Sequence, residues 1–169
     1  FFSSAQAQAS VLQEGWYRII SGGRHVGFVV LRVEFDEKKK QFVSTSFTQT
    51  SPMAGDLKES LVAVSNEKLE PVSYMFTSQI GKLAKTIDAA FSKDLMTAKV
   101  TEGDKQESVQ NKLQKGTFLS QFLVYVILQS KEGMKKNNNF AYSAVAEEDA
   151  KAVKGEAFVS DTEKHKGLD

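Results

Sequence analysis

Residues 28–50 decide the fold, because they contain two apolar alternations joined by a charged turn. The first run is Phe28-Val-Val-Leu-Arg-Val-Glu-Phe35, whose odd-numbered residues are all apolar, whereas two of its even-numbered residues are charged. Asp36-Glu-Lys-Lys-Lys40 follows, and Phe42-Val-Ser-Thr-Ser-Phe-Thr-Gln-Thr50 returns with apolar and threonine side chains alternating with serines. A period of two is typical of strands, so this stretch predicts an antiparallel hairpin.

The same alternation runs from Gly15 to Leu113 in about eight short runs separated by turn residues, without an intervening helix. Gly22-Gly-Arg-His-Val-Gly27 is predicted to be a hairpin turn rather than a phosphate cradle, since a strand and not a helix follows it. Pro71 argues against an interior position for the run Leu69 to Ser78, because proline cannot donate to a ladder.

The period changes at Phe118 to Leu128, which is apolar nearly all round and predicts a helix packed against the concave face of the sheet. Its β-branched residues Val124, Val126 and Ile127 leave a strand open as the alternative. As a helix it covers about 17 Å against a membrane core of about 30 Å, so we expect no transmembrane segment. Phe140 to Ala146 and Lys154 to Ser160 are two further predicted strands.

Together these patterns predict a mainly β (α+β) fold. It is a curved antiparallel sheet or unclosed β-barrel of about eight to ten strands wrapped around one apolar helix. The length of 169 residues suits one domain, which we place over residues 11–160. Residues 161–169 are expected to be a polar tail or a truncated continuation.

Residues 1–10, Phe-Phe-Ser-Ser-Ala-Gln-Ala-Gln-Ala-Ser, contain overlapping A-x-A frames of the kind that signal peptidase recognises. They predict a signal-peptide remnant and a periplasmic or otherwise exported protein. A disordered arm of Ala, Gln and Ser is the alternative. The absence of cysteine suits an exported chain that does not rely on disulfides.

Composition and motifs argue against catalysis, metal binding and nucleic-acid binding. The balance of 22 basic and 21 acidic residues is far from that of a nucleic-acid binder. Only two histidines occur, His25 and His165, and neither has a second ligand at metal-binding spacing. No motif of a nucleophilic or metal-dependent enzyme is found. We therefore expect no catalytic residue, no metal, no cofactor and no nucleic-acid partner.

Aromatic residues are the outstanding feature, and they are expected to point into one space. They form either core alone or core plus a cavity that accepts an acyl chain or the apolar side of a peptide. The candidate groove residues are Trp16, Phe35, Phe47, Tyr74, Phe76, Phe91, Phe122, Tyr125, Phe140 and Tyr142.

Two motifs carry a family resemblance: Gly15-Trp-Tyr-Arg-Ile-Ile20 before the glycine-flanked turn, and Leu69-Glu-Pro-Val-Ser-Tyr74 after a long meander. The chain resembles, over about Gly15 to Val159, exported Gram-negative proteins of unknown function. In outline these are similar to the periplasmic lipoprotein carriers LolA and LolB, whose unclosed antiparallel barrel is lined with apolar residues. The resemblance implies a scaffold for lipid, lipoprotein or an envelope partner, without catalysis. This chain has one predicted helix where the carriers have a lid of several. No functional residue is carried over, because the binding residues of the carriers do not align with this chain.

Two functions lead as hypotheses, and an enzyme is the least favoured third. The first is a non-catalytic periplasmic or cell-envelope protein that binds a lipid or a lipoprotein acyl chain in a concave groove. The alternative is a structural or protein–protein interaction module of the cell envelope.

Overall fold

The computed structural model describes residues 9–161, which form a large antiparallel sheet and a small second sheet. The first sheet consists of β1 (Ser10–Ser21), β2 (Arg24–Asp36), β3 (Gln41–Thr50), β4 (Leu57–Asn66), β5 (Pro71–Ile80), β6 (Leu83–Ser92), β7 (Leu95–Glu102) and β8 (Lys105–Lys112). The second consists of β9 (Phe118–Leu119), β10 (Asn139–Ala146) and β11 (Lys151–Phe158). Two 3-10 turns, η1 (Pro52–Ala54) and η2 (Ser120–Phe122), and one helix, α1 (Leu123–Gln129), complete the described chain. The expectations for residues 1–8 and 162–169 lie outside the described residues.

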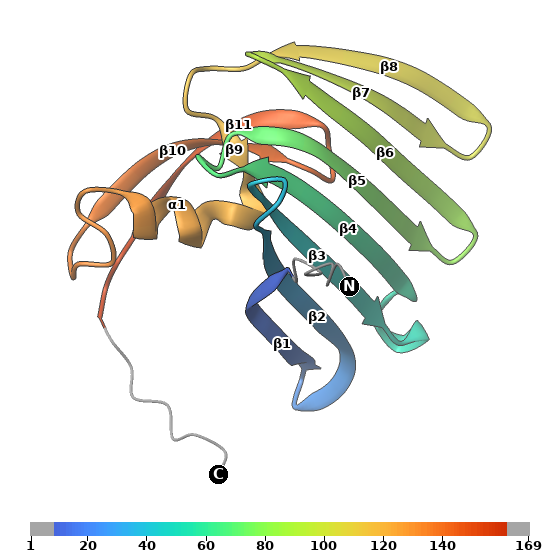
Figure 1. Cartoon of the computed structure of the whole chain (residues 1–169). Helices are drawn as coiled ribbons and strands as arrows, with labels where there is room; N and C mark the ends of the chain where they lie inside the picture. Colours follow the sequence, from blue (N-terminus) through green and yellow to red (C-terminus); the bar gives the residue numbers. More distant parts are fainter. Residues whose placement is uncertain (1–8, 162–169) are drawn as a thin grey trace, which may run out of the picture.

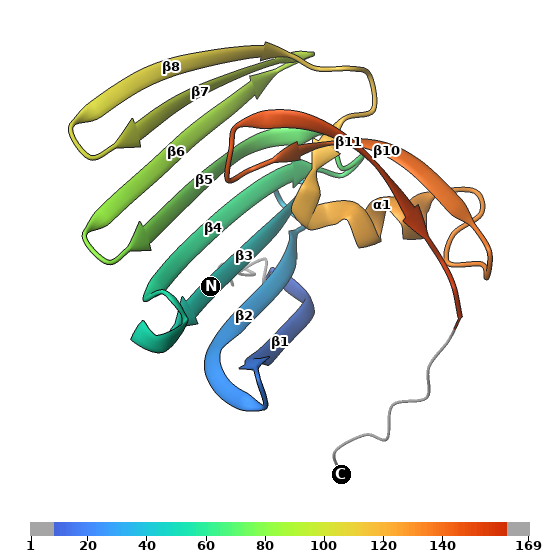
Figure 2. The ribbon, with the colours of Figure 1, turned by 180° about the vertical axis from the view of Figure 1, so that it is seen from behind.

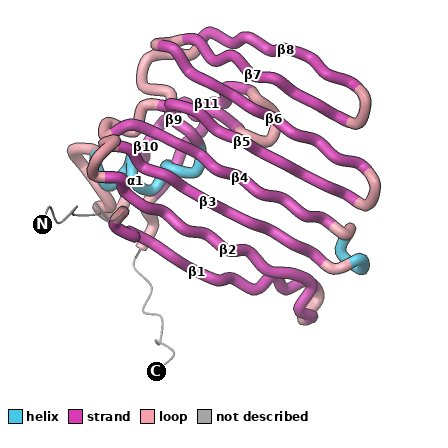
Figure 3. Tube along the Cα trace, turned by 45° about the vertical axis from the view of Figure 1, so that its right-hand side comes forward, coloured by secondary structure: helices cyan, strands magenta, loops and turns pink. Residues whose placement is uncertain are grey.

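The eight strands of the large sheet stand in sequence order, each antiparallel to its chain neighbours (Figure 3). Tight turns make this possible. Gly22 and Gly23 connect β1 to β2 with φ of 56° and 75°, left-handed values that a two-residue hairpin turn requires and that glycine adopts without cost. At the next turn the Asp36 carboxylate accepts hydrogen bonds from the Lys38 and Lys39 amides at 2.9 and 3.0 Å.

The prediction of a mainly β chain with a large, unclosed antiparallel sheet is confirmed. β1 and β8 are the two ends of the strand order and do not pair with each other. The sequence predicts eight strands before Leu113, and eight are found.

The predicted helix over Phe118 to Leu128 is correct for its second part only. Phe118 and Leu119 instead form β9, which pairs in parallel with Ala144 and Val145 of β10. A 3-10 turn follows, and α1 begins at Leu123. The strand alternative thus holds at the start of this stretch, where both side chains are buried. In the part of the chain that the structure describes, no helix has the length and apolar character to cross a membrane.

The expectation that Pro71 argues against an interior strand is wrong. β5 lies between β4 and β6 in the middle of the sheet. Proline is tolerated because it is the first residue of the strand and lies opposite Ser65 at a register shift, where a ladder hydrogen bond is already missing.

The core lies between the large sheet and the segment from β9 to the β10–β11 turn. Figures 1 and 2 show this segment on one side of the large sheet, toward one end of its strands. We call the side that it covers the inner face and the opposite side the outer face. One buried cluster joins strands β4 to β7 with Leu119, Phe122, Val145 and Ala150 from the covering segment. A sheet of one layer could not bury its apolar face without such a cover.

Phe122 tests whether this cover holds the fold. Its side chain is fully buried, so Phe122→Ala is expected to lower the free energy of unfolding by about 3–5 kcal/mol. Val124→Ala, an exposed position on the adjoining helix, serves as the control and is expected to change it by less than about 0.5 kcal/mol. Urea unfolding followed by circular dichroism measures both, and equal effects would contradict the proposed role of the cover.

Candidate functional site

Six of the candidate aromatic residues lie on the inner side of the molecule: Phe35, Tyr74, Phe76, Phe91, Phe122 and Tyr125. The Tyr74 and Phe91 rings lie 6.1 Å apart, and the Phe42 ring lies 4.8 Å from Phe35, 6.3 Å from Phe122 and 6.1 Å from Tyr125. Phe42 is not among the candidates predicted from the sequence, because the alternation of residues 42–50 favours the face of Val43, Thr45 and Phe47.

The deepest of these aromatic residues are closed off by the chain itself. Tyr74 is 1% exposed, Phe76 6% and Phe122 0%. β9, β10 and the turn before β11 supply the atoms that cover them. Tyr74 and Phe122 are part of the core, whereas Phe76 also lines a cavity of about 320 Å³ together with Gln121 and Glu147.

Trp16 and Phe47 do not point into the shared space. In the β2–β3 register Val33 lies opposite Ser44 and Val30 opposite Phe47, so Phe47 belongs to the outer face. Apolar residues occupy both faces of β3, and the contact of Phe42 with Phe122 decides which face is inner. The expected face of β3 is therefore reversed, because a one-residue change of register moves every side chain to the other face.

Phe140 and Tyr142 lie in a third place, on β10. The Tyr142 ring is 5.8 Å from the Phe118 ring, and both residues line a cavity of about 320 Å³ together with Phe140 and Val126. Lys115 and Lys154 also line this cavity. It combines an aromatic wall with two cationic side chains.

The inner face changes character toward the uncovered ends of the strands. Register places Thr48, Glu59, Ser78, Lys85 and Glu102 side by side across β3 to β7. These residues are polar or charged, and Ser78 donates a hydrogen bond to Glu59 at 3.3 Å. This end of the inner face is therefore not an apolar groove.

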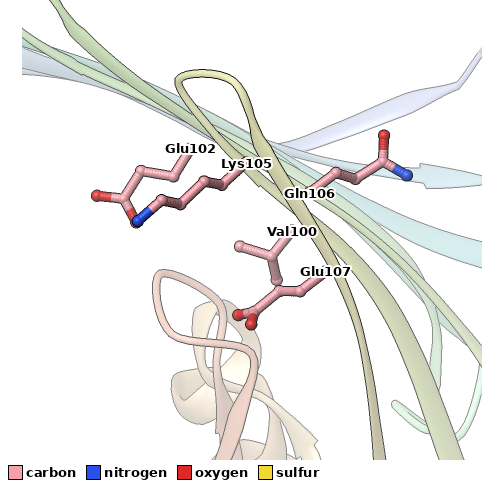
Figure 4. Close-up of a pocket in the computed structure, with 5 residues that line it drawn as sticks. All are labelled: Val100, Glu102, Lys105, Gln106 and Glu107. Atoms are coloured by element: carbon pink, nitrogen blue, oxygen red, sulfur yellow. The ribbon is translucent and has the colours of Figure 1, made fainter.

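A shallow pocket of about 410 Å³ lies on β7 and β8 at this polar end. Figure 4 shows the side chains of Glu102 and Lys105 next to each other, with Val100 and Glu107 beside them and Gln106 pointing the opposite way. Opposite charges and one valine make this a mixed surface. Its two carboxylates, Glu102 and Glu107, lie on either side of Lys105 in the sequence, and no histidine lines the pocket.

Glu147 is a buried acid at the edge of the core. Glu147 is 1% exposed. Its carboxylate accepts hydrogen bonds from the Ser120 hydroxyl at 2.5 Å and from the backbone N–H of Gln121 at 3.4 Å. Burial raises the pKa of Glu147, although the Ser120 hydrogen bond opposes the shift. Burial, with Glu147 as a nearby charge, also raises the pKa of Tyr74, whose hydroxyl has no hydrogen-bond partner among the described atoms.

The outer face carries an exposed apolar cluster, here called the outer patch and made of Trp16, Phe28, Val30, Phe47, Val62 and Met75. The Trp16 and Phe28 rings stack at 6.2 Å, and the Phe28 and Phe47 rings lie 5.9 Å apart. Trp16 is 72% exposed, Met75 57% and Val62 41%. Val62 pairs with Met75, and Val30 lies between Trp16 and Phe47.

The patch continues into a row of side chains without charge. From Trp16 the row crosses all eight strands through Val30, Phe47, Ser60, Thr77, Thr86, Thr101 and Gln106. The neighbouring row, which contains Val62 and Met75, carries Glu14 and Arg32 on one side of these two residues and Asp88 and Lys99 on the other. Only a knowledge of the register could have shown this surface, because its members come from five separate strands.

Residues 9–161 contain no group of three or more His, Asp or Glu side chains that could hold a metal ion. Comparison with known proteins found no matching family model, no matching curated protein and no matching solved structure. The resemblance to the lipoprotein carriers stays a prediction.

Glu147 yields a prediction about pH. Because burial favours the protonated acid, folded Glu147 keeps its proton at pH values where the unfolded chain has lost it. Its contribution to stability is thus greatest below the ordinary pKa of 4.5 and falls as pH rises from there through the raised folded pKa. Glu147→Gln should remove this fall and be more stable than wild type at neutral pH.

Urea unfolding across an acid-to-neutral pH series measures the difference. Glu148→Gln, at the exposed neighbouring residue, is the control that should keep the wild-type slope. If Glu147→Gln keeps that slope as well, Glu147 is not the titrating group.

Proposed function

We propose that this chain is a non-catalytic protein–protein interaction module of the cell envelope and that the outer patch is its contact surface. The large sheet, wrapped around α1 as the sequence predicts, would serve as the scaffold. The observation that carries this proposal is the exposure of Trp16 and Met75 on a face opposite the packed core.

The chemistry of the outer patch supports a protein partner. An antiparallel sheet with one packed face normally turns polar side chains to water on the other. Interface centres, in contrast, are depleted of charge and enriched in Trp, Phe and Met. The outer patch has this composition, and charged side chains lie only beside it. The partner we propose presents an uncharged, apolar surface of its own.

The envelope location is proposed from the sequence. The A-x-A frames in residues 1–10 and the lack of cysteine support export.

Substitution on the outer face tests the proposal. With a photo-crosslinker at Val62, the wild-type chain should crosslink to one defined protein in native envelopes. Met75→Glu should abolish this crosslink, because a charge at the centre of an interface is strongly unfavourable. Gln110→Glu adds the same charge to an exposed site on β8 of the same face and should leave the crosslink intact. Equal crosslinking in both variants, or none in wild type, would contradict the proposal.

A second candidate function, binding of a lipid or lipoprotein acyl chain, is favoured by the cavity of Phe118, Val126, Phe140 and Tyr142. Its aromatic wall suits an acyl chain, and the ammonium groups of Lys115 and Lys154 suit an anionic headgroup. This proposal moves the ligand from the expected concave groove to the face of the small sheet.

A fluorescent fatty-acyl probe tests this candidate. Phe140→Asp places a charge in the cavity and should weaken binding of the probe at least about tenfold, because an apolar chain cannot solvate it. Met75→Glu, on the outer face of the large sheet and not among the residues that line this cavity, should bind like wild type. Circular dichroism confirms that both variants fold. No displaceable probe binding by wild type would reject acyl-chain binding.

A further inference from the structure

The free edges of the two sheets differ in how they are protected. β8 carries Lys105 and Lys112 at its ends, and β11 carries Lys151 and Lys154. Lysines on an edge strand discourage pairing with another chain. β1, Ser10–Ser21, contains no lysine and no proline. Its large apolar residues are exposed instead: Val11, Leu12, Trp16, Tyr17 and Ile20.

The free edge of β1 has one regular stretch. Register shifts fall between Val11 and Gln13 and between Ile19 and Ile20, so Gln13–Ile19 is unbroken. Trp16 is at its centre. An antiparallel copy of the same stretch can therefore pair with it over its full length about a two-fold axis at Trp16.

We propose that two copies of this chain form a dimer by antiparallel pairing of their β1 edges, centred on Trp16. This register sets Glu14 opposite Arg18 of the partner subunit, and Arg18 opposite Glu14 of the partner subunit. Opposite charges directly across a strand pair are stabilising, and like charges are destabilising. The stretch is thus complementary in charge to its own antiparallel copy.

The surroundings of the two charged residues agree with this pairing. Arg18 makes no salt bridge within residues 9–161, so the partner subunit's Glu14 would supply one. Glu14 binds Arg32 at 2.9 Å, but Arg32 also binds Glu34 at 2.6 Å and is not dependent on Glu14 alone. Both Glu14 and Arg18 are exposed and can reach a second chain.

The remaining cross-strand neighbours also fit. Trp16 meets Trp16 of the partner subunit, an aromatic cross-strand pair of a favourable kind. Gly15 lies opposite Tyr17 of the partner subunit, and an added Cβ at Gly15 would clash with the chain's own Tyr17 ring. The dimer would join the two outer patches into one continuous surface.

Charge reversal distinguishes this dimer from other associations. Glu14→Arg alone and Arg18→Glu alone each set like charges opposite one another twice, and each should weaken the dimer at least about tenfold. An equimolar mixture of the two variants restores two opposite-charge pairs and should form a heterodimer of wild-type affinity. Sedimentation velocity over a concentration series measures all three, with thermal melting to confirm that the variants fold.

Disulfide trapping tests the centre of the pairing. The chain has no cysteine, so Trp16→Cys introduces a single thiol that faces its own copy across the axis. Directly opposite Cα atoms in antiparallel strands are about 4.5–5.5 Å apart, within the range of a disulfide. Mild oxidation should give a covalent dimer, whereas Gln110→Cys on the β8 edge should stay monomeric.

A wild-type protein that stays monomeric at every concentration tested, a mixture that fails to recover, or equal trapping at Gln110→Cys would overturn the proposal. These outcomes leave the proposed function separately testable, because the variants at residues 14 and 18 do not touch Met75 or Val62.

Discussion

The packing of Leu119, Phe122, Val145 and Ala150 onto the inner face is the contact on which the rest of the molecule depends. Eight strands in sequence order form a single layer, and a single layer cannot shield its apolar rows from water. The C-terminal part of the described chain provides the second layer, held also by hydrogen bonds from Lys85 to the Glu148 carbonyl at 2.7 Å and from Asn111 to the Ala150 carbonyl at 2.9 Å. With the cover in place, the inner aromatic residues become core.

That use of the inner face determines where binding can occur. The apolar residues under the cover are buried, and the row of Glu59, Lys85 and Glu102 at its margin is polar. The apolar surface that remains accessible is on the outer face, at the edge of β1 and beside β10. The outer patch and the free edge of β1 meet at Trp16, which belongs to both. A dimer through β1 would therefore enlarge the outer patch rather than cover it.

The sequence predicts where the strands lie but not which side chains of a strand belong to the inner face. Alternation and turn residues locate each strand of the large sheet, since these signals are local. The face of a strand is not local when apolar residues occupy both sides, as Phe42 and Phe47 do in β3; contact with Phe122, eighty residues away in sequence, decides it. The prediction from Pro71 was wrong for a related reason, because the register shift beside it depends on how β5 pairs with Val64 and Ser65 of another strand. The same limit hid the outer patch, whose members come from five strands.

The order of the strands has a consequence for how the chain reaches its native state. Each strand of the large sheet pairs with its predecessor, so this sheet can assemble progressively from the N-terminal end through local contacts, which form quickly. The cover comes later in the chain, beginning at Phe118. While the chain is incomplete, the inner face is a sheet of unshielded apolar rows, the kind of intermediate that aggregates or binds chaperones. The apolar rows of the inner face can therefore be buried only after residues 118–150 have been added to the chain.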